Sequence, residues 1–217
     1  MRWKQKTDQE FGTQTEGRYF IGSLPEALPG LEPLTTPLDR YLLIETRSSW
    51  SAIFSNGLGV NDVASPVGYL PEVLKCRGLN VDCMPDRSKM RAKDALQIYG
   101  AIRFSLYGPE KTDWLNQIRY VGVANDVSGW EFSARGKVQP YEETANYENR
   151  KIVDRFTPDM LESYCAALGI RLFDENFYAG QCLVSSTKRT TSPGPSMSIA
   201  EAKSHLYLQS ISLDRLI

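Results

Sequence analysis

The amino-acid sequence predicts an α+β fold, with a mainly antiparallel sheet and helices packed on one face of it. The segment 130–141, WEFSARGKVQPY, alternates apolar and polar side chains up to a glycine, as a half-buried antiparallel strand does. Other segments share this period of two, and two segments with helical spacing lie among them. Because strands and helices do not alternate regularly along the chain, an antiparallel sheet is favoured over a parallel one.

The composition is that of an ordinary folded domain. The chain has 217 residues, of which 41% are hydrophobic, and this fraction is enough to build a core. A net charge of -1 attracts neither nucleic acid nor an anionic membrane over long range. The basic start has no apolar run after it, and no window reaches the length of a membrane-spanning helix. We therefore expect a soluble, cytoplasmic protein that binds no nucleic acid and no membrane.

Prolines and linker composition divide the chain. Prolines recur at nearly regular intervals near the start, from Pro25 to Pro37, and they forbid a long helix there. Near the end, Ser198 and Glu201 have the spacing of a capping box that opens a last helix. The predicted organisation is a proline-rich arm (1–40), a single α+β domain (41–184), a linker (185–197) and a C-terminal segment with a helix (198–217).

The strands are predicted from alternation and from turn residues. Residues 41–45 and 50–57 are expected to form a hairpin, residues 79–84 a strand, and residues 120–125 another strand after one or two helical turns at 112–119. Between them lies a long strand in which Gly100 indicates a bulge or a close backbone approach. Its predicted apolar face carries Leu96, Ile98, Ile102, Phe104 and Leu106, and its polar face carries Gln97, Tyr99, Arg103, Ser105 and Tyr107.

Two helices are predicted to cover one face of this sheet. Ser65-Pro66 opens the first, at about 66–76, and Thr157-Pro158 opens the second, at about 158–168, which ends before Gly169. The second has an apolar stripe that includes Tyr164 and Cys165. Under the sheet, we expect three aromatic side chains to belong to the core: Trp50, Trp130 and Phe132.

The sequence supplies few of the residues that several common kinds of catalytic site need. His205 is the one histidine of the chain, so a Ser-His-Asp or Cys-His arrangement would have to be built on it, and a solvated or capping histidine is the simpler interpretation. Histidine-based zinc sites and two-histidine iron sites are excluded by this count. No glycine-rich phosphate loop is present. The four cysteines match neither a zinc knuckle nor a disulfide framework, and we expect reduced thiols, with a bridge between the first two as the alternative: Cys76, Cys83, Cys165 and Cys182. We assign no catalytic residue, no metal ligand and no cofactor.

Carboxylates support one alternative. A metal-dependent hydrolase needs carboxylates that converge from different strands. The candidates are Asp82, Asp86, Asp94, Glu142, Glu143, Asp174 and Glu175. A solvated acidic surface is the simpler interpretation, because none of them lies in an apolar strand. The basic run Arg87, Lys89, Arg91 and Lys93 has the spacing of a soluble loop, with phosphate binding as the alternative.

The polar face of the long strand is the candidate contact surface. Tyr99, Arg103 and Tyr107 are evenly spaced on it, and tyrosine and arginine are the residues that anchor protein interfaces. Ordinary cross-strand pairing with neighbouring strands is the alternative. The predicted partner-binding residues are Tyr99, Arg103, Tyr107 and the cross-strand candidates Arg119, Glu131 and Arg135.

A resemblance points in the same direction. The order WSAIFSNG, SPVGYLPEVL, a strand ending in LYGP, GWEFSARGKVQPYE and YENRKIVDRFTPDMLESYCAALGI resembles a family of uncharacterised bacterial single-domain proteins. More loosely, the tryptophan strand, the glycine turn and the late helix resemble immunity proteins of bacterial toxin systems. The resemblance covers about 41–178, and none of these motifs carries chemistry.

The resemblance and the polar strand face favour a non-catalytic protein-binding protein. Its partner would be a protein, and the resemblance implies an immunity-type inhibitor that binds and occludes a bacterial toxin. Two alternatives stay open at this point. One is a small carboxylate-based hydrolase that depends on a divalent metal, and the other is a structural or regulatory subunit.

Overall fold

The protein is described from a computed structural model, which covers residues 14–35, 39–58, 64–86, 88, 99–112, 114–126, 128–188 and 196–205. The chain forms two compact units. Unit 1 combines Met1–Asp62 with Gly169–Ser204, and unit 2 is Val63–Leu168 with His205–Ile217. Among the described helices, none is long and apolar enough to cross a membrane.

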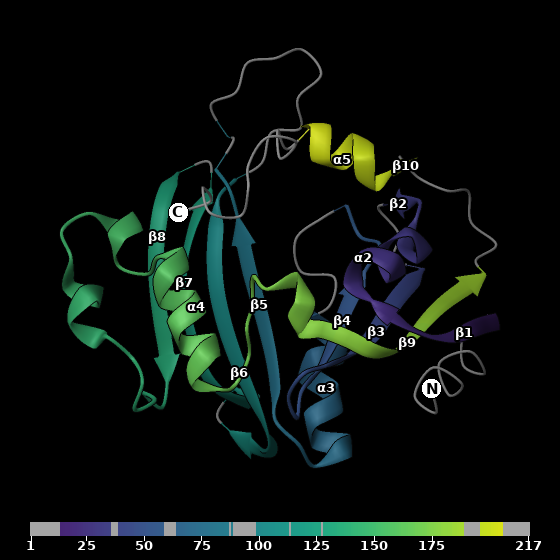
Figure 1. The fold of residues 1–217 in the computed structure, drawn as a ribbon. Coiled ribbons are helices and arrows are strands. Elements are labelled where there is room, and N and C mark those ends of the chain that lie inside the picture. Colours follow the sequence, from purple (N-terminus) through teal and green to yellow (C-terminus); the bar gives the residue numbers. More distant parts are fainter. Residues whose placement is uncertain are drawn as a thin grey trace. The chain divides into compact units, whose positions relative to one another are not determined.

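Unit 1 is built on a four-stranded antiparallel sheet (Figure 1). Its strands follow the order β1 (Gln14–Ser23), β9 (Tyr178–Lys188), β3 (Arg40–Thr46) and β4 (Ser51–Ser55). The hairpin predicted at 41–57 is confirmed as β3 and β4. The N-terminal arm and the linker differ from the prediction, because β1 lies in the predicted arm and the last residues of β9, from Ser185 to Lys188, lie in the predicted linker.

Short elements complete unit 1. The helix α2 (Leu24–Ala27) and the 3-10 helix η1 (Leu28–Leu31) bury three apolar side chains between them, namely Leu24, Ala27 and Leu31. The strands β2 (Leu34–Thr35) and β10 (Ser196–Met197) form a second, two-stranded sheet. The 3-10 helix η4 (Glu175–Phe177) precedes β9, and α5 (Ile199–His205) opens with the predicted capping box. In that box the Ser198 N–H donates to the Glu201 carboxylate at 2.7 Å.

A buried asparagine links β2, β3 and β4. The Asn56 side chain is fully buried, and its amide oxygen accepts from the backbone N–H groups of Asp39 and Arg40 at 3.2 and 3.0 Å. Its amide nitrogen donates to the Thr35 hydroxyl, at 3.2 Å, and to the Asp39 carboxylate, at 2.6 Å. Because both ends of this amide are paired, its burial is compatible with a stable core.

Unit 2 is built on a four-stranded antiparallel meander (Figure 1). Its strands are β5 (Gly78–Met84), β6 (Ala101–Thr112), β7 (Leu115–Asp126) and β8 (Gly129–Gly136). The helices are α3 (Ala64–Leu74) and α4 (Pro158–Ala167), and two 3-10 helices, η2 (Thr144–Glu148) and η3 (Ile152–Asp154), lie between β8 and α4 in the chain. The predicted helical turns at 112–119 are wrong, because this segment is the β6–β7 turn and the start of β7.

The two helices of unit 2 pack on opposite faces of its sheet, which corrects the prediction that they share one. The continuous register of β6 with β5 from Ala101 to Tyr107 makes the β6 side chains alternate strictly. Phe104 contacts Tyr164 of α4, with ring centroids 5.9 Å apart. Tyr107, on the other face, lies under α3: its ring is 3.7 Å from where a Cβ would stand on Gly68. The α+β class itself is confirmed.

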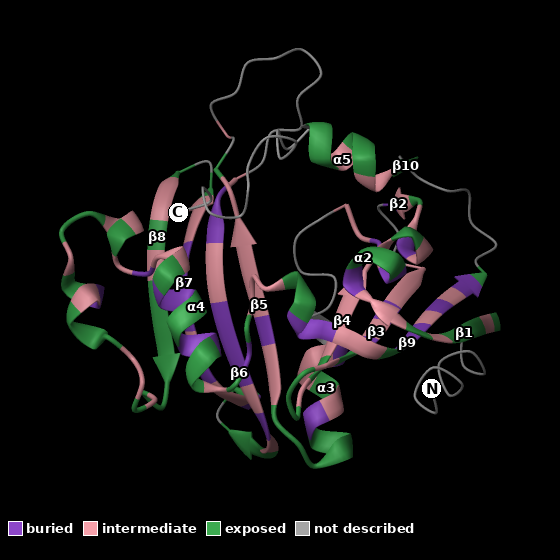
Figure 2. Ribbon diagram, viewed as in Figure 1, coloured by how far each residue is buried: buried purple, intermediate pink, exposed green. Residues whose placement is uncertain are grey.

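The core of unit 2 lies between the sheet and α4. Phe104, Val121 and Val123 are fully buried on the sheet, and Leu161 and Tyr164 are fully buried on α4. Figure 2 shows the buried and exposed residues alternating along α4, as an amphipathic helix requires. The Thr157 hydroxyl accepts from the Met160 N–H at 3.3 Å at the start of α4, and Gly169 follows with a φ of +79°, so both predicted ends of this helix are confirmed.

The aromatic residues predicted as core are only half-buried. Trp50, Trp130 and Phe132 are of intermediate exposure. Trp130 and Phe132 do share a face of β8 opposite Glu131 and Arg135, as the alternation predicted. The Trp130 ring lies against Gly100, where a Cβ would come within 2.7 Å of it, so the predicted close approach at this glycine is confirmed.

The single domain predicted for 41–184 is replaced by the two units. The reason is β9, which follows α4 in the sequence but pairs with β1 and β3 of unit 1. Among the described strands, β5 to β8 pair only with one another. The basic run 87–93, Asp94, Leu96, Ile98 and residues 206–217 lie outside the described residues, apart from Ser88.

Candidate functional site

A dense polar cluster lies between β7 and the segment before α4. The Arg119 side chain is 4% exposed and the Glu142 side chain is 0% exposed. Arg119 Nε donates to both carboxylate oxygens of Glu142, at 2.9 and 3.1 Å, and Arg119 Nη2 donates to Oε2 at 2.6 Å. The remaining nitrogen, Nη1, donates to the Gly136 carbonyl at 3.1 Å. This bidentate pair is the strongest type of ion pair that side chains form.

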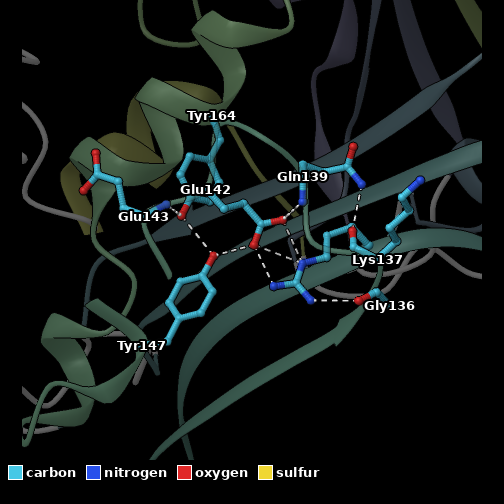
Figure 3. Close-up of polar contacts among 8 residues, drawn as sticks. Gly136, Lys137, Gln139, Glu142, Glu143, Tyr147 and Tyr164 are labelled. Atoms are coloured by element: carbon cyan, nitrogen blue, oxygen red, sulfur yellow. Dashed lines mark hydrogen bonds and ion pairs between the residues drawn. The ribbon is translucent and has the colours of Figure 1, made fainter. Parts of the chain in front are cut away.

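Two tyrosines extend the cluster towards α4 (Figure 3). The Tyr147 hydroxyl donates to Glu142 Oε2 at 2.8 Å, and the Tyr164 hydroxyl lies 2.9 Å from it. Tyr164 in turn accepts from the Glu143 N–H at 2.8 Å. Since the Tyr147 proton is directed at the carboxylate, Tyr164 donates to Tyr147, and the hydrogen bonds run in one direction from backbone to Glu142. Burial, with these hydrogen bonds, raises the pKa of Tyr147, and burial also raises the pKa of Tyr164.

This cluster holds the fold together. Every polar atom of the Arg119 and Glu142 side chains has a partner, and the Gln139 N–H adds a bond to Glu142 Oε1 at 2.7 Å. Neither carboxylate oxygen has room for a metal or a substrate, and neither residue is exposed. Arg119 therefore lies on the core face of the sheet, away from the contact surface for which the sequence proposed it.

The described carboxylates among those named for a hydrolase have different surroundings. Glu142 is bound to Arg119, and Asp82 lies 3.8 Å from Arg103. Asp86 accepts from Asn125 at 3.0 Å, whereas Asp174 and Glu175 belong to unit 1. Within the described parts of the chain, no three His, Cys, Asp or Glu side chains gather as ligands of a metal ion.

Asp82 lies in β5 and is half-buried beside Arg103. Its side chain is 14% exposed, and its Oδ2 has no hydrogen bond within the described structure. Burial raises the pKa of this carboxyl, and the positive charge of Arg103 opposes that change only in part. Arg103, on the polar face of β6, is therefore already paired with a carboxylate of its own chain.

The exposed part of the polar face lies on β8 and at the β6–β7 turn. Arg135 is exposed on β8, and its guanidinium lies 4.6 Å from the ring centre of Trp114 and 4.9 Å from that of Tyr120. Both distances are within the range of cation–π attraction. Glu131 and Ser133 continue the exposed row along β8. We call this set, Trp114, Tyr120, Glu131, Ser133 and Arg135, the Arg135 surface.

The turn that carries Trp114 exposes two large apolar side chains. Trp114 is 58% exposed, and Leu115 is 84% exposed with a φ of +62°, a left-handed conformation that costs free energy in a residue with a side chain. The turn is ordered by the Thr112 hydroxyl, which accepts from the Trp114 N–H at 3.2 Å and donates to the Gln117 carbonyl at 2.9 Å. An ordered turn that exposes apolar groups is typical of a contact site.

The structure brings together only some of the predicted contact residues. Arg135 and Glu131 share the exposed row, and Arg103 and Tyr107 lie on the same face of the sheet but are half-buried, beside Asp82 and α3. Tyr99 precedes β6 and is half-buried as well. Trp114 and Tyr120 were not predicted as contact residues. Tyr120 is identified by the strand register, which pairs it with Arg135, and Trp114 by its contact with the Arg135 guanidinium.

The cysteines are free thiols in the structure. Cys165 and Cys182 are buried, Cys83 is half-buried and Cys76 is exposed. Burial raises the pKa of Cys165 to about 12, so this thiol is not ionised near neutral pH. The bridge considered between Cys76 and Cys83 is not formed.

Comparisons with protein-family models, with curated proteins and with solved structures find no match to this chain.

Proposed function

We propose that this chain is a non-catalytic protein-binding protein, and that the Arg135 surface with the Trp114–Leu115 turn is where it binds its protein partner. The observation that carries the proposal is the cation–π contact of the exposed Arg135 with both Trp114 and Tyr120. Tryptophan, tyrosine and arginine are the residues most enriched among the anchors of protein interfaces. Here the rings hold the guanidinium in place before binding, so little side-chain entropy is lost on association.

Exposure and strain support the same site. The surface adds two exposed apolar side chains at an ordered turn, one of them in a costly backbone conformation. An exposed apolar residue that costs folding free energy is consistent with a role in binding a partner rather than in stabilising the fold. We further propose that the partner is a bacterial toxin and that binding occludes it, as in immunity proteins. This finer part rests on the resemblance over 41–178.

The proposal is tested by capture of the partner and by protection of cells. The tagged full-length protein is used to isolate its partner from the native host, and the binding constant is then measured with both proteins purified. Trp114→Ala and Arg135→Ala are each expected to weaken binding by about thirtyfold or more, which corresponds to about 2 kcal/mol. Cells that express the captured protein should stop growing unless this chain is expressed with it.

The matched control is Lys151→Ala, which removes an exposed ion pair with Asp154 elsewhere in unit 2. Its binding should equal that of the unmodified protein. Unchanged binding by both the Trp114 and the Arg135 variants would reject the proposed surface. A captured partner that does not harm cells would reject the toxin part alone.

A further inference from the structure

The strand β1 forms one edge of the unit 1 sheet. It pairs with β9 over all ten of its residues, from Gln14 with Lys188 to Ser23 with Ala179, and the register has no shift. In the strand order of the described sheet, β1 stands at the end (Figure 1). It contains neither a proline nor a bulge, which are two of the devices that natural proteins use to block pairing at an edge.

The exposed side chains of β1 are of a kind that a second strand would cover. Tyr19 is 68% exposed and Ile21 is 84% exposed. On the other face of the strand, Glu16 and Arg18 are exposed and lie two residues apart, on either side of Gly17. The Arg18 guanidinium lies 5.6 Å from the ring centre of Phe20, which keeps it on this face.

The charges of β1 are complementary to those of a second β1 in one antiparallel register. When Gly17 of one copy faces Gly17 of the other, each Glu16 stands directly opposite an Arg18, and this happens twice. Shifting the centre by one residue in either direction places Glu16 opposite Glu16 or Arg18 opposite Arg18. Because like charges directly opposite each other are destabilising and opposite charges are stabilising, the charges select the register centred on Gly17.

We propose that two copies of this chain form a symmetric dimer by antiparallel pairing of their β1 strands, centred on Gly17. The pairing joins the two unit 1 sheets into one continuous sheet across a two-fold axis. It places Tyr19 of each copy opposite Thr15 of the other, so that part of the exposed ring area is covered. The backbone hydrogen bonds provide the attraction, and the Glu16–Arg18 pairs set the register.

The experiment measures the mass of the full-length protein by sedimentation equilibrium over a wide range of concentrations. The unmodified chain is expected to pass from monomer to dimer as its concentration rises. Glu16→Arg and Arg18→Glu should each raise the dimer dissociation constant by roughly tenfold or more, because each change turns two attractive pairs into two repulsive ones. An equimolar mixture of the two variants should dimerise again, since every arginine of one then faces a glutamate of the other.

One control isolates the contact that Glu16 makes within its own chain. Glu16 forms an exposed ion pair with Lys188 at 2.7 Å, and Lys188→Gln removes this pair while both β1 charges remain. This variant should dimerise like the unmodified chain, and circular dichroism melts should show all variants folded. A protein that stays monomeric at every concentration overturns the proposal. A dimer dissociation constant that the charge reversals leave unchanged overturns it as well. So does an equimolar mixture of the two variants that fails to dimerise.

Discussion

Arg119 and Glu142 show how a buried charge is made compatible with the core. The carboxylate has lost all contact with water, and it is compensated by the guanidinium, by the Tyr147 hydroxyl and by the Gln139 N–H. Removing one member leaves the others without partners in a medium of low dielectric constant. The residues of this cluster are therefore expected to govern the stability of unit 2.

Glu142→Ala should lower the free energy of unfolding by about 3–5 kcal/mol, because it leaves the buried Arg119 charge unpaired. Urea denaturation followed by tryptophan fluorescence measures this change. Lys151→Ala, which breaks an exposed pair, should change the same quantity by less than about 1 kcal/mol. Equal effects of the two variants would mean that the Arg119–Glu142 pair is hydrated.

Tyr141 presents the opposite case, a buried hydroxyl without a hydrogen-bond partner in the described structure. Burial, with the nearby negative charge of Glu142, raises the pKa of Tyr141 to about 12. In the unfolded chain a tyrosine loses its proton near pH 10. Between pH 10 and about 12 the folded state therefore holds more protons than the unfolded state, and stability falls as the pH rises through this range.

Tyr141→Phe should make the alkaline loss of stability smaller, because the phenylalanine has no proton to lose. At pH 7 the variant should be as stable as the unmodified protein or more stable, since an unsatisfied hydroxyl is removed from the interior. Thermal melts from pH 7 to 11 test both points. A variant that melts lower at pH 7 would show that the hydroxyl has a bonding partner.

At the scale of the element, Gly136 ends β8 in a conformation that glycine favours. Its φ is +84°, and a Cβ at this position would stand 2.3 Å from the Ile118 carbonyl oxygen. That carbonyl accepts from the Lys137 N–H at 3.0 Å, and the Gly136 carbonyl accepts from Arg119. The glycine turn that the sequence placed after the tryptophan strand thus connects β8 to the buried cluster.

Gly136→Ala should lower the free energy of unfolding by more than Gly169→Ala does. Both glycines have a positive φ, which costs an alanine about 1–2 kcal/mol, but nothing lies within 4 Å of a Cβ at Gly169. The difference between the two variants, measured by urea denaturation, therefore reports the steric clash at Ile118. Equal losses would show that β7 moves aside without cost.

The elements that sequence reasoning found are those with a local signal. Alternation identified β8 and the two faces of β6, because it does not depend on how the strands pair. A capping threonine followed by a proline identified α4. The β6–β7 turn was taken for a helix because Trp114 and Leu115 occupy it in place of glycine or asparagine. The strand β9 was missed because it is central in its sheet, so that Cys182 and Leu183, on opposite faces, are both buried and no alternation shows.

The candidate site was predictable only in part for the same reason. Arg135 follows from alternation, since its position on β8 decides its face. Arg119 was assigned to the polar face, although it lies two residues before Val121 and therefore shares the apolar face of β7 with it. Trp114 and Arg135 meet only because β7 and β8 pair in this register, so their stacking could not be read from the sequence.

At the scale of the whole molecule, the chain of unit 1 is interrupted by unit 2. The strands β1 and β3 precede unit 2 in the sequence, and β9, which pairs with both, follows it. The hydrogen bond between the Thr15 and Thr187 hydroxyls joins residues 172 positions apart. Unit 2, in contrast, has its four strands and both helices within one continuous segment.

A fragment of residues 63–168 should therefore fold alone, whereas a fragment of residues 1–62 should not. The first contains the buried Arg119–Glu142 cluster and every strand of its sheet, and the second lacks the strand that β1 and β3 share. Amide dispersion in two-dimensional nuclear magnetic resonance spectra distinguishes the two outcomes. An unfolded 63–168 fragment would show that unit 2 needs unit 1 for its stability.

The late position of β9 also sets the order of events on the ribosome. Between the end of β3 at Thr46 and the start of β9 at Tyr178, 132 further positions (178 − 46) must be translated. At synthesis rates of roughly 5–20 residues per second, this takes on the order of 7 to 26 seconds. Until β9 has been synthesised, β1 and β3 lack their shared neighbour, so Leu42 and Ile44, which are buried in the folded protein, are not yet enclosed by the complete sheet.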